Sequence, residues 1–550
     1  SILRAGQEKV ESILRAGQEK VESILRAGQS ILRAGQEKVE SILRAVQEKE
    51  RQERPPAGEP KEAAAPTPAI PEEGALETYP VNEPFAYISI ENTKPPRYII
   101  QEVALTDGEK ELLNELKTRL YDVVDITFTG TGETEAYLRS KVMTIIRDFR
   151  IELIPESIER IVYYITRDFV GYGKMDAVFR DNSVEDISVN GPDINLYVYH
   201  RRHGSLETNV RFNTEELDAL IYKMAQRSGR HISLANPILG ASLPTKDRLQ
   251  MTIGDEVTTR GSTFTIRKFR DVPFSPIDMV KFGSISLEMA AYFWMAVENG
   301  TNILFAGGTA SGKTSMLNAM SMFIPANSKI VSIEDTREIN LLHQNWIPAV
   351  TREGSESRRI EMFDLLRAAL RQRPEYILVG EVRGREAYTL FQAMATGHFT
   401  LSTFHGDSVN AVVRRLTKAP IDVPLMLLDS LDIIVLLGMV KIGVSRGRRV
   451  TGIVEVTGVD FDNETLTTNQ PFSWRPDEFT FSGESRLFEK IMRKLNISEE
   501  EVSKEFSRRL QILKLLIEQK ITDFERLAEV FFQFSVDPDE TERKVREGKL

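Results

Sequence analysis

The sequence has no cysteine among its 550 residues, which excludes disulfide bonds and zinc sites built on thiolates. It also lacks an excess of positive charge, since the net charge is −10 at pH 7. This balance argues against a surface that binds nucleic acid over its whole extent, but a local basic patch is still compatible with it. No apolar run reaches the roughly 18 uncharged residues that a membrane-spanning helix needs. No basic segment followed by an apolar core opens the chain, so we expect a cytoplasmic protein.

Hydrophobic residues make up 41% of the chain and charged residues 28%, proportions typical of a soluble globular protein. A chain of this length exceeds what one hydrophobic core supports, so we expect several domains. The first is an arm over residues 1–50, in which "SILRAGQEKVE" recurs. Its eleven-residue period suits a helix or coiled coil, but each glycine costs about 1 kcal/mol inside a helix. A helical arm and a disordered, functionally neutral extension therefore both remain open.

The rest of the chain divides by composition into a linker and three further parts. Residues 51–80 are rich in Pro, Ala and Glu and predict an extended linker. Residues 81–270 mix strand and helix patterns and predict an α+β domain, including a helix over 214–229 with a capping signal at Thr214. Residues 271–286 read as an interdomain linker. Residues 483–550 predict a helical segment, with capping signals at Ser498 and Thr522.

Between these parts, residues 287–482 alternate strands with helices, which predicts an α/β domain whose parallel sheet is flanked by helices. The expected strands of this domain are 301–307, 329–335, 376–381, 399–404 and 432–438. The expected strands of the preceding domain include 184–191, 194–202, 206–212 and 262–269.

"GGTASGKTS" follows the first of the α/β strands and matches the phosphate-binding P-loop pattern. Glycines let the loop curve so that its N–H groups point at phosphate, Lys313 would reach the β- and γ-phosphates, and the Thr314 hydroxyl would ligate Mg²⁺. The candidate nucleotide-binding residues are Gly307, Gly308, Thr309, Ala310, Ser311, Gly312, Lys313, Thr314 and Ser315. The motif predicts a site for a nucleotide with Mg²⁺.

Two strands end in acids. "KIVSIED" ends in Glu334-Asp335, and "YILVGE" ends in Gly380-Glu381. The carboxyl ends of neighbouring parallel strands meet at one crevice, so both glutamates can face the γ-phosphate. Glu381 can hold Mg²⁺ through water or orient the attacking water, and we expect Gly380 to leave room for the phosphate. A surface or helix-capping role is the alternative for Glu334.

Two histidines flank another strand in "TGHFTLSTFHG". Neutral His398 and His405 could donate to the γ-phosphate or to the water shell of Mg²⁺. A structural role for His398 is the alternative, and a metal-ligand role is disfavoured because no third ligand lies at a useful spacing.

Together these stretches resemble the secretion-type hexameric ATPases that drive type II secretion, type IV pili and the archaeal pilus and archaellum systems. The likeness runs from about Val184 to Thr457 and includes "EDISVNGPDINLYVYHRRHG", "VSIEDTREINL" and "LLRAALRQRPEYILVGEVRGREA". In that family the Mg²⁺-site strand ends in Gly-Glu. Bacterial type II members commonly carry a tetracysteine zinc module, so its absence favours an archaeal relative.

The resemblance implies a RecA-like P-loop motor domain behind an α+β N-terminal domain, assembled as a homohexameric ring with ATP and Mg²⁺. By matching motifs, Glu334 falls in the family's acidic box, Glu381 in its Mg²⁺ motif, and His398 and His405 in its histidine box.

Two arginines of the N-terminal domain, Arg248 and Arg267, are implied to reach the nucleotide; the alternative is a salt bridge on the strand surface. Arg383 and Arg385 could either position Glu381 or line a subunit contact, and the sequence does not choose between these roles.

The implied activity is ATP hydrolysis that closes and reopens the two domains and so drives a polytopic membrane platform protein and pilin-like machinery. The protein would then be cytoplasmic and peripheral on the inner face of the membrane, with no nucleic-acid partner. Two alternatives stay open: a hexameric ATPase that translocates nucleic acid, and a nucleotide-gated scaffold without turnover.

Overall fold

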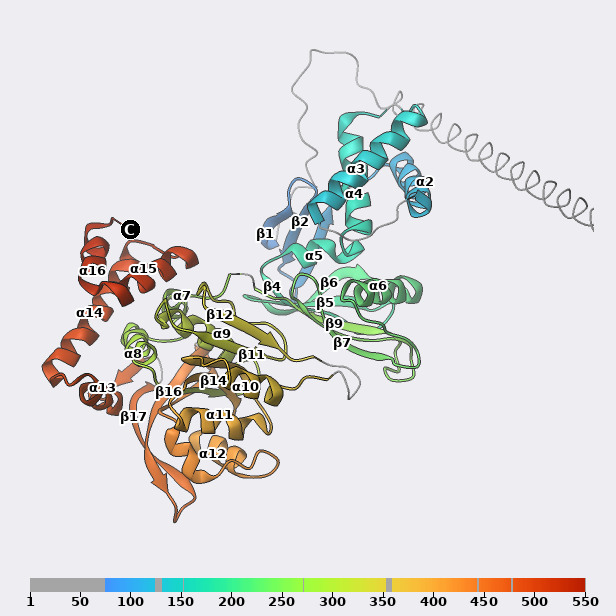
Figure 1. The fold of residues 1–550 in the computed structure, drawn as a ribbon. Helices are drawn as coiled ribbons and strands as arrows, with labels where there is room; N and C mark the ends of the chain where they lie inside the picture. The colour runs from blue at the N-terminus through green and yellow to red at the C-terminus, as the bar shows by residue number, and fades with distance from the viewer. Residues whose placement is uncertain are drawn as a thin grey trace, which may run out of the picture. The chain divides into compact units, whose positions relative to one another are not determined.

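The computed structural model describes residues 75–123, 131–151, 153–270, 272–352, 359–442, 445–475 and 478–549. The predicted repeat arm and most of the predicted linker lie outside these residues. The described chain forms two compact units, divided between Lys268 and Phe269 (Figure 1). None of the helices described is both long and apolar enough to cross a membrane.

The first unit is built on a nine-stranded sheet in the order β1-β2-β3-β6-β5-β4-β9-β8-β7. Its strands are β1 (Ala75–Asn82), β2 (Ala86–Glu91), β3 (Arg97–Glu102), β4 (Val184–Val189), β5 (Asn195–His200), β6 (Gly204–Arg211), β7 (Ile238–Ser242), β8 (Arg248–Thr252) and β9 (Thr263–Arg267). Because β1 begins at Ala75, residues 75–80 are strand rather than the linker we predicted.

The described residues of this unit form the helices α2 (Asp107–Val123), α3 (Thr131–Asp148), α4 (Pro155–Phe169), α5 (Asp176–Arg180) and α6 (Thr214–Arg227). The cap of α6 is Asn213 rather than Thr214, because the Asn213 side chain accepts from the backbone N–H of Glu216 and the Glu216 carboxylate accepts in return. Helices α2, α3 and α4 bury a small core of their own, separate from the core under the sheet.

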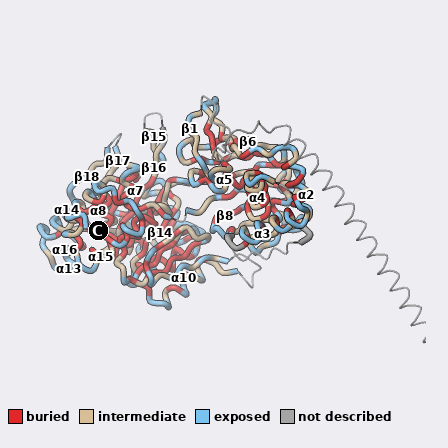
Figure 2. The backbone as a smooth tube through the Cα atoms, turned by 90° about the horizontal axis from the view of Figure 1, so that it is seen from above, coloured by how far each residue is buried: buried red, intermediate tan, exposed pale blue. Residues whose placement is uncertain are grey.

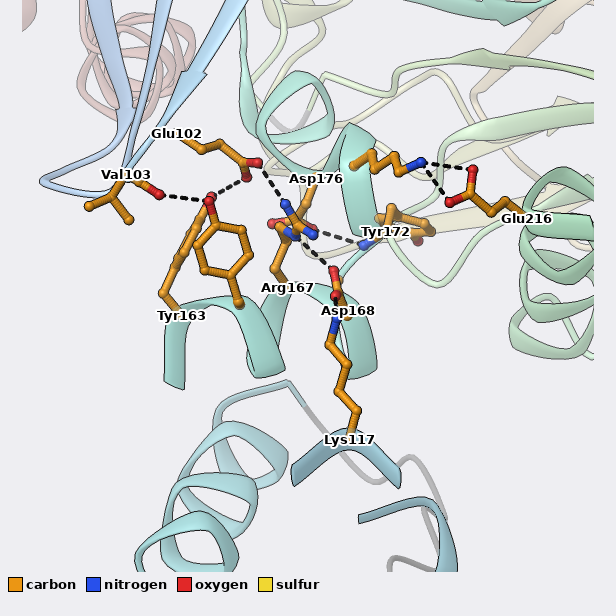
Figure 3. Close-up of polar contacts among 12 residues, drawn as sticks. Glu102, Val103, Lys117, Tyr163, Arg167, Asp168, Tyr172, Asp176 and Glu216 are labelled. Carbon is orange, nitrogen blue, oxygen red and sulfur yellow. Dashed lines mark hydrogen bonds and ion pairs between the residues drawn. The ribbon is translucent and has the colours of Figure 1, made fainter. Parts of the chain in front are cut away.

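A polar network ties α4 to the sheet and α2 to α4 (Figure 3). On β3, the carboxylate of Glu102 accepts from Tyr163 Oη and Arg167 Nη1, both at 2.6 Å. Arg167 Nε donates in turn to Asp168 at 2.7 Å, and Asp168 is paired with Lys117 of α2. Partly buried charges that compensate one another in this way fix the helices on the sheet without a large apolar interface.

The second unit has a nine-stranded mixed sheet in the order β12-β11-β13-β14-β10-β15-β16-β17-β18. In this order, the neighbouring strands from β12 through β10 to β15 pair in parallel, as predicted. The neighbouring strands from β15 to β18 pair antiparallel. The strands are β10 (Ile303–Gly307), β11 (Ile330–Glu334), β12 (Trp346–Val350), β13 (Tyr376–Val382), β14 (Phe399–His405), β15 (Ile433–Ile442), β16 (Ser445–Asp460), β17 (Thr465–Arg475) and β18 (Glu478–Phe481).

Helices cover both faces of this sheet, because successive residues of a strand point to opposite sides. On β10, Ile303 and Phe305 belong to one core, and Leu304 and Ala306 belong to the other. The strands of this unit are largely coloured as buried in Figure 2. One face carries α10 (Met362–Leu370), α11 (Glu386–Ala395) and α12 (Val409–Thr417). The predicted RecA-like α/β fold is thereby confirmed.

The other face carries α7 (Pro276–Lys281), α8 (Leu287–Glu298), α9 (Lys313–Met320), α13 (Arg486–Leu495), α14 (Glu499–Glu518), α15 (Phe524–Val536) and α16 (Pro538–Glu547). The C-terminal helices therefore share the core of the sheet instead of forming a separate segment. Buried Glu455 of β16 holds the start of α13, since its carboxylate accepts from Ser485 Oγ and the backbone N–H of Leu487. The Ser498 cap of α14 is confirmed, while α15 is capped by Asp523 rather than Thr522.

Candidate nucleotide-binding site

The P-loop joins the end of β10 at Gly307 to the start of α9 at Lys313. Two of its residues adopt left-handed backbone conformations, with φ of 57° at Ala310 and 90° at Gly312, the N-cap of α9. The Lys313 ammonium donates to the carbonyl oxygens of Gly307 at 3.1 Å and Gly308 at 2.8 Å. The curved loop and the first N–H groups of α9 have the geometry of an anion site.

Close packing explains the first glycine of the loop. A Cβ atom on Gly307 would stand 2.4 Å from the carbonyl oxygen of Leu437 on β15 and 2.6 Å from Ser311 Oγ. The Ser311 hydroxyl donates to the Gly308 carbonyl at 2.9 Å. A larger residue at 307 would therefore separate the loop from the neighbouring strand.

Glu381 lies in a β-bulge at the end of β13. Residues 379 and 382 pair with residues 402 and 404 of β14, so the stretch through Gly380 and Glu381 holds one residue more than its partner. A bulge of this kind changes the direction of a side chain at the edge of a sheet and is common beside active sites. This geometry sets Glu381 apart from the regular ladder at the end of the strand.

Arg383 holds the Glu381 carboxylate through a 2.5 Å contact from Nη2 and also lies 3.4 Å from Asp335. Burial acts to raise the pKa of Glu381, but the hydrogen bond and charge of Arg383, with the charges of Lys313 and His405, bring it below its ordinary value. Glu381 is therefore ionised at neutral pH. The structure thus assigns Arg383 the positioning role that the sequence left open.

Arg385 has a different contact. Its Nη2 donates to Glu361 at 2.5 Å, and its guanidinium lies over the ring of Phe363, 4.6 Å from the centroid. It contacts α10 and the residue that caps it, and has no contact with Glu381 among those found.

Glu334 ends β11, the strand next to β13, and only 2% of its surface is exposed. Its Oε1 accepts from the backbone N–H groups of Glu338 and Ile339, both at 2.9 Å, while Oε2 is buried without a hydrogen-bond partner among the described residues. Burial outweighs those two hydrogen bonds and raises the pKa of Glu334 to about 8. Two glutamates on adjacent strands thus hold opposite protonation states near neutral pH, a pattern typical of acid and base pairs in active sites.

The glycine before Glu381 has a packing reason in addition to the predicted one. A Cβ atom on Gly380 would stand 3.1 Å from Cγ of Glu334. The small residue therefore makes room for the buried glutamate of the next strand, and the expectation that it also leaves room for phosphate stays a prediction.

The two histidines lie at opposite ends of β14. His405 pairs with Gly307 of β10 and so lies at the carboxyl-terminal end of the parallel strands, where the P-loop begins. His398 directly precedes Phe399, the first residue of β14, and its backbone N–H donates to the Ala393 carbonyl. At about 3.3 Å per residue the strand separates them by roughly 23 Å.

His398 therefore does not lie beside His405 within the chain, and a role of His398 at a nucleotide stays a prediction. The ring Nδ1 of His398 lies 3.2 Å from the same Ala393 carbonyl. His398 closes the end of α11, which is the structural role we had kept as the alternative.

Arg248 and Arg267 belong to the first unit. They begin β8 and end β9, stand directly opposite each other in the antiparallel ladder, and are both exposed. Like charges opposite each other destabilise a sheet by up to about 1 kcal/mol. Asp186 of β4 pairs with Arg267 from the other side, so a carboxylate lies beside the two arginines, and their role at the nucleotide stays a prediction.

A residue that the sequence did not reveal lies against the P-loop. Arg448 of β16 donates from Nε to the Ala310 carbonyl at 3.0 Å, and its Cδ stands 3.4 Å from where a Cβ on Gly312 would lie. The contact joins residues 138 positions apart, so no local motif could have indicated it.

The donors fit Mg²⁺ bound together with a nucleotide. Within the described ranges, no three His, Cys, Asp or Glu side chains converge on a metal site. Mg²⁺ prefers oxygen ligands and is commonly held by one or two protein groups plus substrate phosphates. The Thr314 hydroxyl on α9 and the ionised Glu381 are donors of that class.

Comparison with known proteins gives the family. Residues 174–512 match the family model described as type II/IV secretion system protein. The uncharacterized protein MJ0900 of Methanocaldococcus jannaschii is 36% identical over 493 residues, covering 83% of this chain and 88% of that protein. The type IV secretion system protein PtlH of Bordetella pertussis is 32% identical over 259 residues, covering 42% of this chain and 76% of PtlH.

Among solved structures, the ATPase DotB of Legionella pneumophila matches with a TM-score of 0.39 and 16% identity, over 65% of this chain and 95% of DotB. By the family model and the relative that spans most of both chains, the chain belongs to the type II/IV secretion system protein family.

Proposed function

We propose that this member of the type II/IV secretion system protein family hydrolyses ATP as the ring-forming motor of a type II secretion or type IV pilus-like assembly system. The observation that carries the proposal is the pair of glutamates on adjacent strands. Glu381 is ionised and aimed by a bulge, and Glu334 is buried with one oxygen unpartnered. Both end strands on the edge of the sheet that bears the P-loop.

In this proposal the P-loop and the first turn of α9 bind the phosphates, and Lys313 leaves the loop carbonyls to reach them. Mg²⁺, when bound with the nucleotide, would be held by Thr314 and Glu381 and would neutralise charge on the phosphate oxygens. Glu381 orients the attacking water. Protonated Glu334 can donate a hydrogen bond where charge develops, and His405 contacts the phosphate or its water shell.

The exposed arginines of the first unit complete the site in our proposal. Arg248 and Arg267 would stabilise the charge that spreads over the transferring phosphoryl group, as arginine fingers do. Because these residues and the P-loop belong to different units, ATP binding would close the units on each other and hydrolysis would release them. Six subunits in a ring would convert those movements into work on a membrane platform protein.

The relatives agree with this setting without establishing it. PtlH is described as a type IV secretion system protein, and secretion motors act from the cytoplasmic face of a membrane, where we place this chain as a peripheral protein. A relative in Sinorhizobium fredii, 30% identical over 287 residues, is described as a probable conjugal transfer protein. That name keeps a nucleic-acid translocase as the second candidate.

Stimulation of ATP turnover distinguishes the two candidates. We expect vesicles of acidic lipid to raise turnover by the purified chain and single-stranded DNA to leave it unchanged, with Lys313→Ala as the blank. Activation by DNA and not by lipid would favour the translocase. A chain that binds ATP and never exceeds the blank would be the nucleotide-gated scaffold.

A further inference from the structure

Residues 448–450, near the start of β16, contact two segments that a nucleotide-driven motor would use. One is the P-loop. The other is residues 282–284, which follow α7 in the stretch that we predicted as an interdomain linker. All these residues belong to the second unit, so their contacts are described within one compact body.

On the P-loop side, Arg448 donates from Nε to the Ala310 carbonyl at 3.0 Å and packs its aliphatic stem near Gly312. Ala310 has a φ of 57°, a conformation that non-glycine residues rarely adopt without support. The arginine therefore helps to hold the loop in this shape. A nucleotide that draws Lys313 away from the Gly307 and Gly308 carbonyls changes the hydrogen bonds of the same loop.

On the linker side, Arg449 donates from Nη1 to the Phe282 carbonyl at 2.9 Å. A Cβ atom on Gly283 would stand 3.1 Å from Nη2 of the same guanidinium. The next residue adds a backbone contact, since the Val450 N–H donates to the Ser284 carbonyl at 2.9 Å. Three consecutive residues of β16 thus connect the P-loop with this turn.

The turn is attached to a stiff element. Helix α7 begins with a capping box between Ser275 and Asp278, and it contacts α9, the helix that starts at the P-loop. Phe282, the C-cap of α7, packs edge-on against Phe274, which precedes the helix, at a centroid distance of 5.1 Å. Residues 274–282 can therefore transmit a displacement from β16 toward the boundary with the first unit.

The backbone between the two contacts pairs with β15, whose earlier residues, Ile433–Leu437, pair with β10. Arg448 and Arg449 pair with Met439 and Gly438 of β15, and β15 pairs with β10, the strand that ends at Gly307. Successive residues of a strand point to opposite faces, so one arginine reaches the loop while the next reaches the turn. A displacement of the Arg448 side chain therefore acts on Arg449 through the backbone that the two residues share.

We propose that Arg448 and Arg449 are a coupling pair that transmits the state of the P-loop to the segment leading to the first unit. Arg448 responds to the loop, and Arg449 fixes the Phe282 carbonyl and with it the end of α7. Both are positioning residues. The inference rests on the proposed function, because the movement that it couples is the nucleotide-dependent closure of the two units.

The absence of native cysteine makes the movement measurable. The substitutions Gln226→Cys on α6 and Lys504→Cys on α14 place one cysteine in each unit at an exposed position. A donor and an acceptor dye can then be attached without labelling any native residue. The full chain is titrated with a non-hydrolysable ATP analogue while energy transfer is recorded. Affinity for the analogue, ATP turnover and thermal stability are measured on the same samples.

Arg449→Ala is the decisive variant, because Arg449 has no contact with the P-loop among those found. We expect its affinity for the analogue to stay within about threefold of the parent. The nucleotide-dependent change in energy transfer should be lost and turnover should fall by about tenfold or more. Arg449→Lys keeps a donor for the Phe282 carbonyl and should retain most of both signals. Arg448→Ala should lose the change in transfer and also bind the analogue more weakly.

Arg493→Ala, on the exposed face of α13 with 71% of its side chain accessible, is the matched surface control and should behave as the parent. An Arg449→Ala variant with parental turnover and a parental change in transfer would overturn the coupling. So would a parent that binds the analogue and shows no change in transfer. A parent that fails to bind any ATP analogue would overturn the proposed function itself, which the affinity measurement identifies separately.

Discussion

Gly380 lies against Glu334: a Cβ atom on the glycine would stand 3.1 Å from Cγ of the glutamate on the neighbouring strand. The Gly380 carbonyl is held from the other side by the hydroxyl of Thr403 on β14. The Gly-Glu pair at the end of β13 therefore has two functions. Its glycine accommodates one glutamate, and its second residue, turned by the bulge, supplies the other.

Gly380→Ala should displace Glu334 without unfolding the chain, since the added methyl group meets the flexible Cγ rather than backbone. We expect turnover to fall by about tenfold or more while ATP affinity changes little, because the phosphate-binding loop is untouched. Steady-state phosphate release and a binding titration measure the two quantities. Parental turnover in this variant would show that the position of Glu334 does not matter to catalysis.

Glu334 should make stability fall as pH rises. Its carboxyl has a pKa of about 8 in the fold against an ordinary 4.5. Between these values the folded chain binds a proton that the unfolded chain has released, so the free energy of unfolding decreases with increasing pH. Glu334→Gln stays neutral and can still accept from Glu338 and Ile339. The apparent melting temperature of this variant should fall less between pH 5 and pH 8 than that of the parent. An equal fall in both proteins would contradict the raised pKa of Glu334.

Arg383→Ala should shift the acid limb of the pH–rate profile upward. Burial raises the pKa of Glu381 and Arg383 lowers it, so removing the arginine leaves burial dominant and the pKa rises. The carboxylate is then protonated at a higher pH and turnover is lost earlier on acidification. Arg385→Ala is the matched control, because Arg385 pairs with Glu361 instead. Equal shifts in both variants would remove the specific role of Arg383.

Arg267→Ala should lower turnover by about a hundredfold or more with nucleotide affinity retained, if this arginine stabilises the transition state. Arg211, an exposed arginine at the end of β6 on the same sheet, provides the control Arg211→Ala, for which we expect parental rates. A rate for Arg267→Ala equal to that of the control would return Arg267 to a surface role.

Local patterns predicted the features that depend on neighbouring residues. The P-loop, the strand ends at Glu334 and Glu381, and the capping box at Ser498 all follow from short motifs. Features that depend on distant pairing were missed. The antiparallel extension β16–β18, the bulge and the Arg448 contact require strands far apart in sequence to meet.

His398 shows what a motif leaves undetermined. Its spacing from His405 equals the length of the strand that follows it, so the two side chains lie at opposite edges of the sheet. The motif reports the residues correctly but not the direction in which β14 runs between them.

The central claim is that one ATP-hydrolysing site is formed by the P-loop and the two strand-end glutamates. Phosphate release by the parent, by Lys313→Ala and by Glu381→Gln, alongside ATP binding by each, tests it most directly. We predict turnover by the parent alone, with weakened binding in Lys313→Ala and retained binding in Glu381→Gln. Parental turnover in either variant would contradict the claim.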